Sequence, residues 1–524
     1  MIIAFLLLTI LIIPIKAYPR ERITEFSNEN SRDETPVTTV TVTDDILQDE
    51  VNRLGINIGA RSRWGDSLTA LKNLISNPGF EAAYMSSNIL LRSDGSNSTA
   101  VMQDFWNGSW NNDVSGAGQP ADFWTGGEYE FVYGNAKGHN GTIAGFNYTK
   151  DSQAVSRPTF VLDHSLPVPN DLDVMMVRKK FDSNYLLTIN ASPASPWSVS
   201  GDGDILFEPN ENRPGTHGEQ SIRLGTDTRL AYYMDTAYRD GDVTGGKGVI
   251  VKGDWNISLW ARGENDGDKV HVELFREGVW PPFASQTFTL SNFWKKHTIN
   301  FSVPVGLDED KDYAAGDFKG ALDLIVETRN LGNGGRIWLD DMFLGKRNQT
   351  NPTIFSDTVV SHLKELNPGI LRGWYGQLGI SLEEFTDPSA GRRNQGYRIG
   401  SRKAESLSYS MHEFLELANE VDASVWLVIP PTLSELELSE LIDYLAGPNS
   451  TPYGSKRAAS GQIDPWTEVF ETIRLEFGNE LWGGGSGSDP FGGASLNGGI
   501  RLGSIANDRF GLMRQNQYFD PDDI

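Results

Sequence analysis

The sequence predicts a multidomain protein in which an antiparallel β-sandwich of jelly-roll type precedes an α/β region built on a parallel sheet. Across residues 80–344, apolar alternations are separated by Gly, Asn and Pro turns about every ten residues, without a long amphipathic helix. After Gly345, helical and strand-like patterns alternate, which is the order of βαβ units and hence of a parallel sheet. The 524 residues leave room for about three domains.

The N-terminal residues predict export rather than a folded domain. Residues 1–17 form an apolar run that is too short to span a bilayer, and we interpret it as a cleaved signal peptide. Residues 18–47 are charged and rich in Ser and Thr, which predicts a disordered N-terminus. We therefore expect a secreted, extracellular protein without a membrane anchor. Nine glycosylation sequons agree with this: Asn97, Asn107, Asn140, Asn147, Asn190, Asn256, Asn300, Asn348 and Asn449.

Composition excludes several functional classes. The chain has no cysteine, so disulfides, thiolate metal sites and a Cys nucleophile are excluded. With 45 Lys plus Arg against 70 Asp plus Glu, the net charge is −25, which argues against nucleic acid as a partner. A polysaccharide or glycan partner is compatible with this charge. The 14 Trp, 16 Tyr and 25 Phe could stack on sugars, although most are expected to build cores.

The first ordered elements are expected within residues 48–76. A strand is predicted over 54–59, where apolar residues alternate with Gly and Asn. A helix is predicted over 68–75, because apolar residues recur at helical spacing and the Asn-Pro-Gly sequence of residues 77–79 would end it.

The β-sandwich is predicted to occupy residues 77–346, either as one unit or as two β subdomains, 77–190 and 191–346. On one of its strands, Trp260 and Leu259 point to opposite faces, so Trp260 fits either a sugar platform or packing on the second face. The strands are expected at residues 129–133, 141–148, 159–162, 173–178, 255–261, 270–274, 322–326 and 337–339.

The α/β region is predicted over residues 347–524. Ser356 can cap a helix that ends at residues 367–369, before a strand at 370–372. The nearly continuous apolar run at 424–429 predicts a strand of a sheet that is covered on both faces. Capping boxes begin the two helices on either side of this run: Ser410 with Glu413, and Ser434 with Glu437.

A carboxylate follows the last predicted strand of this region. Residues 472–477 alternate between polar and apolar, and the strand breaks at Gly478. Glu480 therefore lies just after the carboxyl end of a strand, where (β/α)8 barrels carry their catalytic groups. The alternative is a Gly-Asn turn followed by a surface glutamate.

Asn479 and Glu480 resemble the Asn-Glu acid/base motif of the retaining glycoside hydrolases of clan A. The sequence of residues 476–482, Glu-Phe-Gly-Asn-Glu-Leu-Trp, is most similar to family 51, the α-L-arabinofuranosidases. Further segments are similar to this family in the same order: 54–81, 363–372, 413–418, 425–429, 445–448 and 453–458. The resemblance implies an incomplete (β/α)8 TIM barrel, into which a jelly-roll, galactose-binding-like sandwich is inserted.

The resemblance also implies roles for individual residues. Glu480 would be the general acid/base, and Asn479, Trp482 and Arg372 would bind the substrate. Gln377 stands in a segment that touches the sugar in the family, but its neighbourhood departs from the family's Pro-Gly-Gly sequence. The identity of the sugar therefore stays open.

The sandwich resembles carbohydrate-binding modules of the 4/9 type at residues 77–81, 258–262 and 338–341. Such modules often hold a structural calcium ion. The resemblance implies hard oxygen ligands for this ion, Glu81, Asp340 and Asp341. No other cofactor is expected.

A retaining mechanism needs a second carboxylate about 5–5.5 Å from the first. No Glu follows Glu480, and no later Asp ends an apolar strand. We therefore expect a C-terminally incomplete part of a secreted α-L-arabinofuranosidase-like glycosidase that acts on polysaccharide side chains and is inactive alone. The alternative is a non-catalytic, secreted carbohydrate-binding or adhesion protein with a relic barrel.

Overall fold

The computed structural model describes the chain from residue 54 onward with internal gaps, so the predicted signal peptide and disordered N-terminus lie outside it. The described residues are 54–59, 68–96, 100–105, 121–181, 197–209, 211–234, 249–308, 322–374, 380–398, 403–405, 407–479, 481, 496 and 498–524. Within them, strands form one parallel sheet, two antiparallel five-stranded sheets and one mixed eight-stranded sheet.

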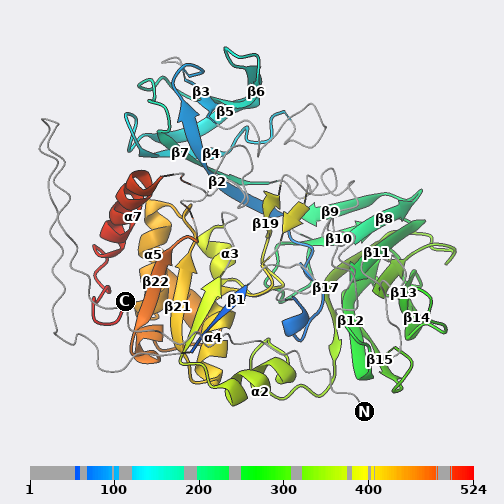
Figure 1. Cartoon of the computed structure of the whole chain (residues 1–524). Helices are drawn as coiled ribbons and strands as arrows, with labels where there is room; N and C mark the ends of the chain where they lie inside the picture. The colour runs from blue at the N-terminus through cyan, green and yellow to red at the C-terminus, as the bar shows by residue number, and fades with distance from the viewer. Residues whose placement is uncertain are drawn as a thin grey trace, which may run out of the picture. The chain divides into compact units, whose positions relative to one another are not determined.

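The parallel sheet has the strand order β1-β18-β21-β22. Figure 1 shows the blue strand β1 among the yellow and orange elements, which come from the later part of the chain. All three pairings are parallel, as the alternation of helices and strands predicts. The strands are β1 (Gly55–Gly59), β18 (Ile370–Trp374), β21 (Ser424–Ile429) and β22 (Ile473–Phe477).

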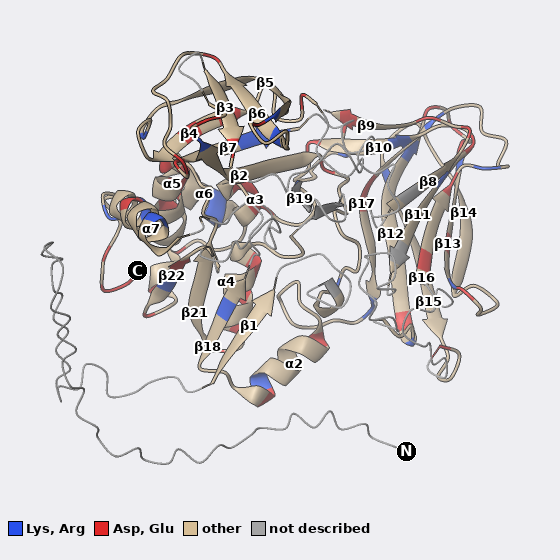
Figure 2. Cartoon of the chain, turned by 45° about the horizontal axis from the view of Figure 1, so that its top comes forward, with Lys and Arg blue, Asp and Glu red and all other residues tan. Residues whose placement is uncertain are grey.

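Three helices of this region, α2, α4 and α5, begin at their predicted caps, Ser356, Ser410 and Ser434. Ser410 and Ser434 both form complete capping boxes, which confirms the prediction for these two helices. In α2, Asp357 lies in the first turn, where a negative charge suits the helix dipole, and the last turn contains both Lys364 and Glu365 (Figure 2). The helices are α2 (Asp357–Leu366), α3 (Leu382–Thr386), α4 (Met411–Glu420), α5 (Glu435–Ala446), α6 (Pro452–Ala459), the 3-10 turn η4 (Trp466–Glu468) and α7 (Gly499–Met513).

The two faces of the parallel sheet differ in burial. Leu371, Val425 and Ile473 are fully buried in one core with apolar residues of α4 and α5. On the opposite face, Trp426 is 38% exposed and Arg474 is also exposed. The prediction of coverage on both faces is therefore right for one face only, because the apolar run includes a Trp that points away from the helices. The described strands form an open sheet, and the (β/α)8 barrel stays a prediction.

The helix predicted over residues 68–75 is wrong. Only Leu68–Ala70 form a 3-10 turn, η1, and residues 71–75 form no helix. The N–H of Lys72 donates to the carbonyl of Ile354 at 2.8 Å, and the N–H of Leu74 donates to that of Leu344 at 2.9 Å. These long-range backbone bonds replace the helical ones, so tertiary pairing overrides the local apolar spacing.

Residues 83–180 form a ring of antiparallel strands, because β2 pairs with both β3 and β7. A closed ring leaves its strands without free edges. Residues 394–405 then add β19 beside β2 and β20 beside β19, which the sequence did not predict. The strands are β2 (Ala83–Arg92), β3 (Val101–Asp104), β4 (Glu128–Tyr133), β5 (Asn140–Lys150), β6 (Ser156–Leu162), β7 (Val174–Lys180), β19 (Asn394–Arg398) and β20 (Lys403–Glu405).

Two further sheets, green in Figure 1, have the orders β15-β12-β17-β10-β9 and β14-β13-β16-β11-β8. Ile257 and Leu259 from the first and Val272 and Leu324 from the second are fully buried in one core. This confirms an antiparallel sandwich, whereas the predicted domain boundaries stay predictions. The strands are β8 (Trp197–Gly201), β9 (Ile205–Pro209), β10 (Gln220–Leu224), β11 (Thr228–Met234), β12 (Gly253–Gly263), β13 (Lys269–Arg276), β14 (Ala284–Thr289), β15 (Lys295–Val303), β16 (Leu322–Glu327) and β17 (Ile337–Lys346).

Candidate functional site

Arg372 on β18 lies at the centre of a polar cluster on the open face of the parallel sheet. Its Nε and Nη2 donate to the two carboxylate oxygens of Glu476 at 2.8 and 2.9 Å. Nη2 also donates to Oδ1 of Asn479 at 2.7 Å, and Nη1 donates to Oδ1 of Asn57 at 2.9 Å. We call these four residues the Arg372 cluster. Three strands and the turn after β22 thus converge on one guanidinium group.

The strand register explains why these side chains meet. Asn57, Arg372, Trp426 and Arg474 are partners across the four strands, so their side chains share one face. The guanidinium group of Arg372 lies 5.5 Å from the centroid of the Trp426 ring. After β22, Gly478 takes a φ of 62°, which a residue with a side chain rarely adopts, and the turn brings the next residue back to the cluster.

The Arg372–Glu476 pair is partly shielded from solvent. Its side chains are 19% and 27% exposed, and the contact is bidentate, which is the strong geometry for an Arg-carboxylate pair. The hydrogen bond from Arg372 fixes the amide orientation of Asn479, whose nitrogen is then its donor group. The cluster therefore holds a charge-balanced ion pair beside an oriented amide, and it runs from the middle of β18 to the turn after the carboxyl end of β22.

The structure brings together two of the predicted substrate-binding residues, Arg372 and Asn479. Glu480, Trp482 and Gln377 lie outside the described residues. Sequence reasoning missed the other members of the cluster, Asn57 and Glu476, and their neighbour Trp426. The two-residue period of residues 473–477 could have identified Glu476, because it places this side chain on the face opposite the buried Ile473 and Phe477.

The three residues proposed as calcium ligands lie in a polar region at one end of the sandwich. Glu81 and Asp340 are buried, and each accepts a backbone N–H, from Glu219 at 3.0 Å and from Arg213 at 2.9 Å. Asp341 pairs with the Arg213 side chain instead. Among the described residues, no group of three His, Cys, Asp or Glu is placed to hold a metal ion. Calcium binding stays a prediction.

The buried carboxyl groups of this region favour their protonated forms. Burial is the main cause that raises the pKa of Glu81 to about 8, and the charge of Asp340 adds to it. Burial and the charge of Asp341 raise the pKa of Asp340 to about 7. A bound cation would favour the ionised forms, so the two groups fit a cation site chemically.

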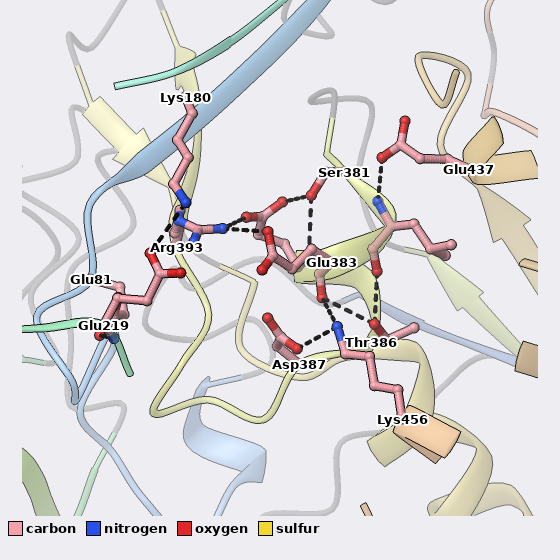
Figure 3. Close-up of polar contacts among 12 residues, drawn as sticks. Glu81, Lys180, Glu219, Ser381, Glu383, Thr386, Asp387, Arg393, Glu437 and Lys456 are labelled. Carbon is pink, nitrogen blue, oxygen red and sulfur yellow. Dashed lines mark hydrogen bonds and ion pairs between the residues drawn. The ribbon is translucent and has the colours of Figure 1, made fainter. Parts of the chain in front are cut away.

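A second polar cluster surrounds the buried Arg393 (Figure 3). Its Nη1 donates to Glu383 at 2.7 Å and to Glu384 at 2.8 Å, and its Nη2 donates to Glu219 at 2.7 Å. Burial raises the pKa of Glu384 to about 7, against the opposing effect of Arg393. Glu383 and Glu384 lie on α3 and Glu219 directly precedes β10, so the ion pairs tie α3 to the sandwich. These pairings indicate a structural role, although a cavity of about 460 Å³ lies beside them.

A groove of about 580 Å³ lies on the outer face of the sheet that contains β12 and β15, and Trp260 lines it. We call it the Trp260 groove. Of the two alternatives for this residue, the structure favours a lining position over packing on the second face. The guanidinium group of Arg213 lies 4.9 Å from the centroid of the Trp260 ring, and Asp341 holds that group in place.

The glycosylation sequons differ in their exposure. Asn256 is half-buried, and Asn97, Asn107 and Asn190 lie outside the described residues. None of the helices within the described ranges combines the length and the apolar character needed to cross a bilayer. Glycosylation and secretion stay predictions. The exposed sequon asparagines are Asn140, Asn147, Asn300, Asn348 and Asn449.

Comparisons with known proteins give only distant likenesses. The sequence matches no family model and no curated protein. One similar solved structure is the arabinose-bound α-L-arabinofuranosidase MgGH51, with a TM-score of 0.40 and 13% identity over 61% of this chain and 51% of that one. This chain thus spans about half the length of that enzyme.

Two other similar structures match shorter parts of the chain. The arabinose complex of the α-L-arabinofuranosidase from Thermotoga maritima has a TM-score of 0.27 and 20% identity, over 33% of this chain and 34% of that one. A structure of CBM4 has a TM-score of 0.20 and 15% identity, over 29% of this chain and 89% of that one. Likeness at this level shows neither a family nor a function.

Proposed function

We propose that this protein is a secreted retaining glycoside hydrolase of the α-L-arabinofuranosidase type, with Glu480 as its general acid/base. The hydrogen bond between Arg372 and Asn479 carries the proposal. It joins Arg372, in the middle of β18, to Asn479, 107 positions later, in the turn that follows the carboxyl end of β22 and immediately precedes Glu480 in the sequence. In an incomplete (β/α)8 barrel this end of the strands would be the catalytic face.

The proposed chemistry assigns one task to each residue. Glu480 protonates the glycosidic oxygen as the bond breaks, and then removes a proton from the incoming water. Asn479, oriented by Arg372, donates to the 2-hydroxyl of the sugar, a contact that strengthens in the transition state. Glu476 binds Arg372 through both of its oxygens, so we assign it the role of holding Arg372 in place. We assign no residue of this chain as the nucleophile.

Binding of a transition-state mimic tests the acid/base site without requiring a nucleophile. A protonated 1,4-imino sugar with the arabinofuranose configuration resembles the oxocarbenium-like transition state and should pair with a carboxylate. In isothermal titration calorimetry, we expect the 524-residue protein to bind this compound and Glu480→Gln to weaken binding at least about tenfold. The control is Glu471→Gln, an exposed glutamate just before β22. No binding, or equal binding by all three proteins, would contradict the proposal.

Catalytic turnover is tested separately from binding, because it requires a nucleophile in addition to the acid/base. Because no second carboxylate is assigned, we expect the chain alone not to hydrolyse aryl α-L-arabinofuranosides. A fluorogenic or chromogenic assay measures this directly. Hydrolysis that Glu480→Gln abolishes would support the acid/base role and show that the nucleophile lies within this chain.

The second candidate function is that of a non-catalytic carbohydrate-binding or adhesion protein. The Trp260 groove favours it, because an indole ring and polar side chains line one concave surface. One variant distinguishes the two functions. Glu480→Gln should weaken binding of the imino sugar at the glycosidase site and leave polysaccharide binding at the Trp260 groove unchanged.

A further inference from the structure

The Trp260 groove is built from facing residues of two antiparallel strands. The register of β12 and β15 places Trp260 opposite Lys296 and Asn256 opposite Asn300. Facing residues in such a pair have Cβ atoms about 4.5–5.5 Å apart, so the two side chains of each pair adjoin, and Ser258 lines the groove between the two pairs. The groove's volume, about 580 Å³, lies within the usual range of ligand pockets.

The charge of the groove is opposite to that of the whole chain. Among its lining residues, the single carboxylate, Asp341, is already paired with Arg213. Within the described part of the chain, the other three lining cations have no carboxylate partner. These unpaired cations are Lys296, Lys346 and Arg347. In a protein of net charge −25, such a concentration of unpaired positive charge gives the groove a local preference for anions.

The amide groups of the groove favour a ligand that carries hydroxyl groups. Asn256, Asn300 and Asn348 line it, and each amide offers two donor hydrogens and an acceptor oxygen. A simple phosphate would use the donors alone, whereas a sugar hydroxyl both donates and accepts. The indole of Trp260 adds an apolar surface of the kind that packs against sugar rings.

We propose that the Trp260 groove binds an acidic polysaccharide that contains uronic acid units. The ligand's carboxylates pair with Lys296, Lys346 and Arg347, and its hydroxyls exchange hydrogen bonds with the asparagine amides. This site is independent of the proposed glycosidase site, because the Arg372 cluster lies on the parallel sheet and shares no residue with the groove.

Titration with two forms of one polymer tests the proposal. Polygalacturonate and its fully methyl-esterified form share a backbone and differ in charge. The protein is produced in a bacterial host that adds no N-glycans, because Asn256, Asn300 and Asn348 belong to sequons. In isothermal titration calorimetry, we expect binding of polygalacturonate and at least a tenfold weaker interaction with the ester. Equal affinity for the two polymers would overturn the proposal.

Two matched variants separate the groove from general charge effects. Lys296→Gln removes a groove cation, whereas Lys295→Gln removes the same charge from the neighbouring residue, which points to the other face. We expect Lys296→Gln to weaken polygalacturonate binding at least fivefold and Lys295→Gln to leave it unchanged. Equal losses would overturn the proposal. Binding of single-stranded DNA of matched charge with the same or higher affinity would also overturn it, in favour of nucleic acid.

Discussion

At the residue scale, the guanidinium group of Arg372 donates four hydrogen bonds on the open face of the parallel sheet. It contacts side chains from β1, from β22 and from the turn after β22. Such a residue positions a site and also stabilises the sheet, because removal of one partner from a shielded ion pair leaves the other charge without compensation.

We expect Arg372→Ala to lower the free energy of unfolding by about 1–3 kcal/mol, since Glu476 loses a bidentate, charged partner. Chemical denaturation followed by tryptophan fluorescence measures the change. The matched control is Arg474→Ala, an exposed arginine on the same face of the sheet, which should change stability by less than about 0.5 kcal/mol. Similar losses in both variants would show that the ion pair contributes nothing specific.

Glu81 makes stability depend on pH in the direction opposite to an ordinary salt bridge. Its pKa is raised by burial to about 8, from an ordinary value of 4.5, so its contribution to stability is complete below pH 4.5 and is lost as the pH rises toward 8. We expect Glu81→Gln to have little effect on Tm at pH 5 and to raise Tm progressively relative to wild type up to pH 8. Differential scanning calorimetry across this range, with the exposed Glu365→Gln as control, measures the effect.

Differential scanning calorimetry also tests the predicted calcium site. If Glu81, Asp340 and Asp341 hold calcium, added calcium should raise Tm at pH 8 in wild type and not in Glu81→Gln. A Tm difference between the two proteins that stays constant from pH 5 to pH 8 would contradict the raised pKa itself.

At the element scale, α7 is held to the sheet of residues 83–180 by a buried carboxylate. Glu130 on β4 accepts from Arg509 of α7 at 2.8 Å and from Arg178 of β7 at 2.9 Å. Both arginines are less than a tenth exposed, and within the described ranges Glu130 is the carboxylate that pairs with each of them. The N-cap residue Gly498 gives α7 no side-chain hydrogen bond, so the stability of α7 depends more on its contact with Glu130.

We expect Glu130→Ala to destabilise the docking of α7 by about 3–5 kcal/mol, because it leaves two buried guanidinium groups unpaired. Amide hydrogen exchange should then rise throughout α7 while the core of the sandwich keeps its protection. The control is Lys137→Ala, which removes an exposed ion pair between Lys137 and Asp508 of α7. We expect it to lower the free energy of docking of α7 by less than about 1 kcal/mol. Unchanged exchange in Glu130→Ala would show that apolar contacts alone hold the helix.

Local signals predicted the elements well, and long-range pairing explains the failures. The capping boxes at Ser410 and Ser434 involve residues three apart, so the sequence contains the whole interaction. The helix expected at 68–75 failed because Lys72 and Leu74 bond to carbonyls about 270–280 positions away. Likewise, Arg372 and Asn479 were identified by resemblance, whereas their partner Asn57 became apparent only from the strand register.

At the scale of the whole molecule, one face of the parallel sheet is only partly covered by the residues that the structure describes. Its outer strands are β1 and β22, and Trp426 is exposed on the open face. Parallel sheets are normally covered on both faces, so the exposed indole of Trp426 offers apolar surface to other molecules.

We expect the protein to self-associate as its concentration rises, and Trp426→Lys to reduce this association, in sedimentation velocity experiments. Trp280→Lys is the control, because Trp280 is 84% exposed but lies in a loop of the sandwich, away from the open sheet. A wild-type protein that stays monomeric at all concentrations, or equal effects of both substitutions, would contradict a role for the open face.

The pairing of β1 with β18 also limits the order in which the sheets can form during synthesis. Gly55 pairs with Ile370, and a ribosome adds about 5–20 residues per second, so the partner strand arrives roughly 15–60 s after β1 has been made. All strands of the sandwich and of the ring at residues 83–180 are synthesised within this interval. The nascent chain therefore carries β1 as an unpaired strand while the inserted sheets fold behind it, and the parallel sheet is the last of these structures that can close.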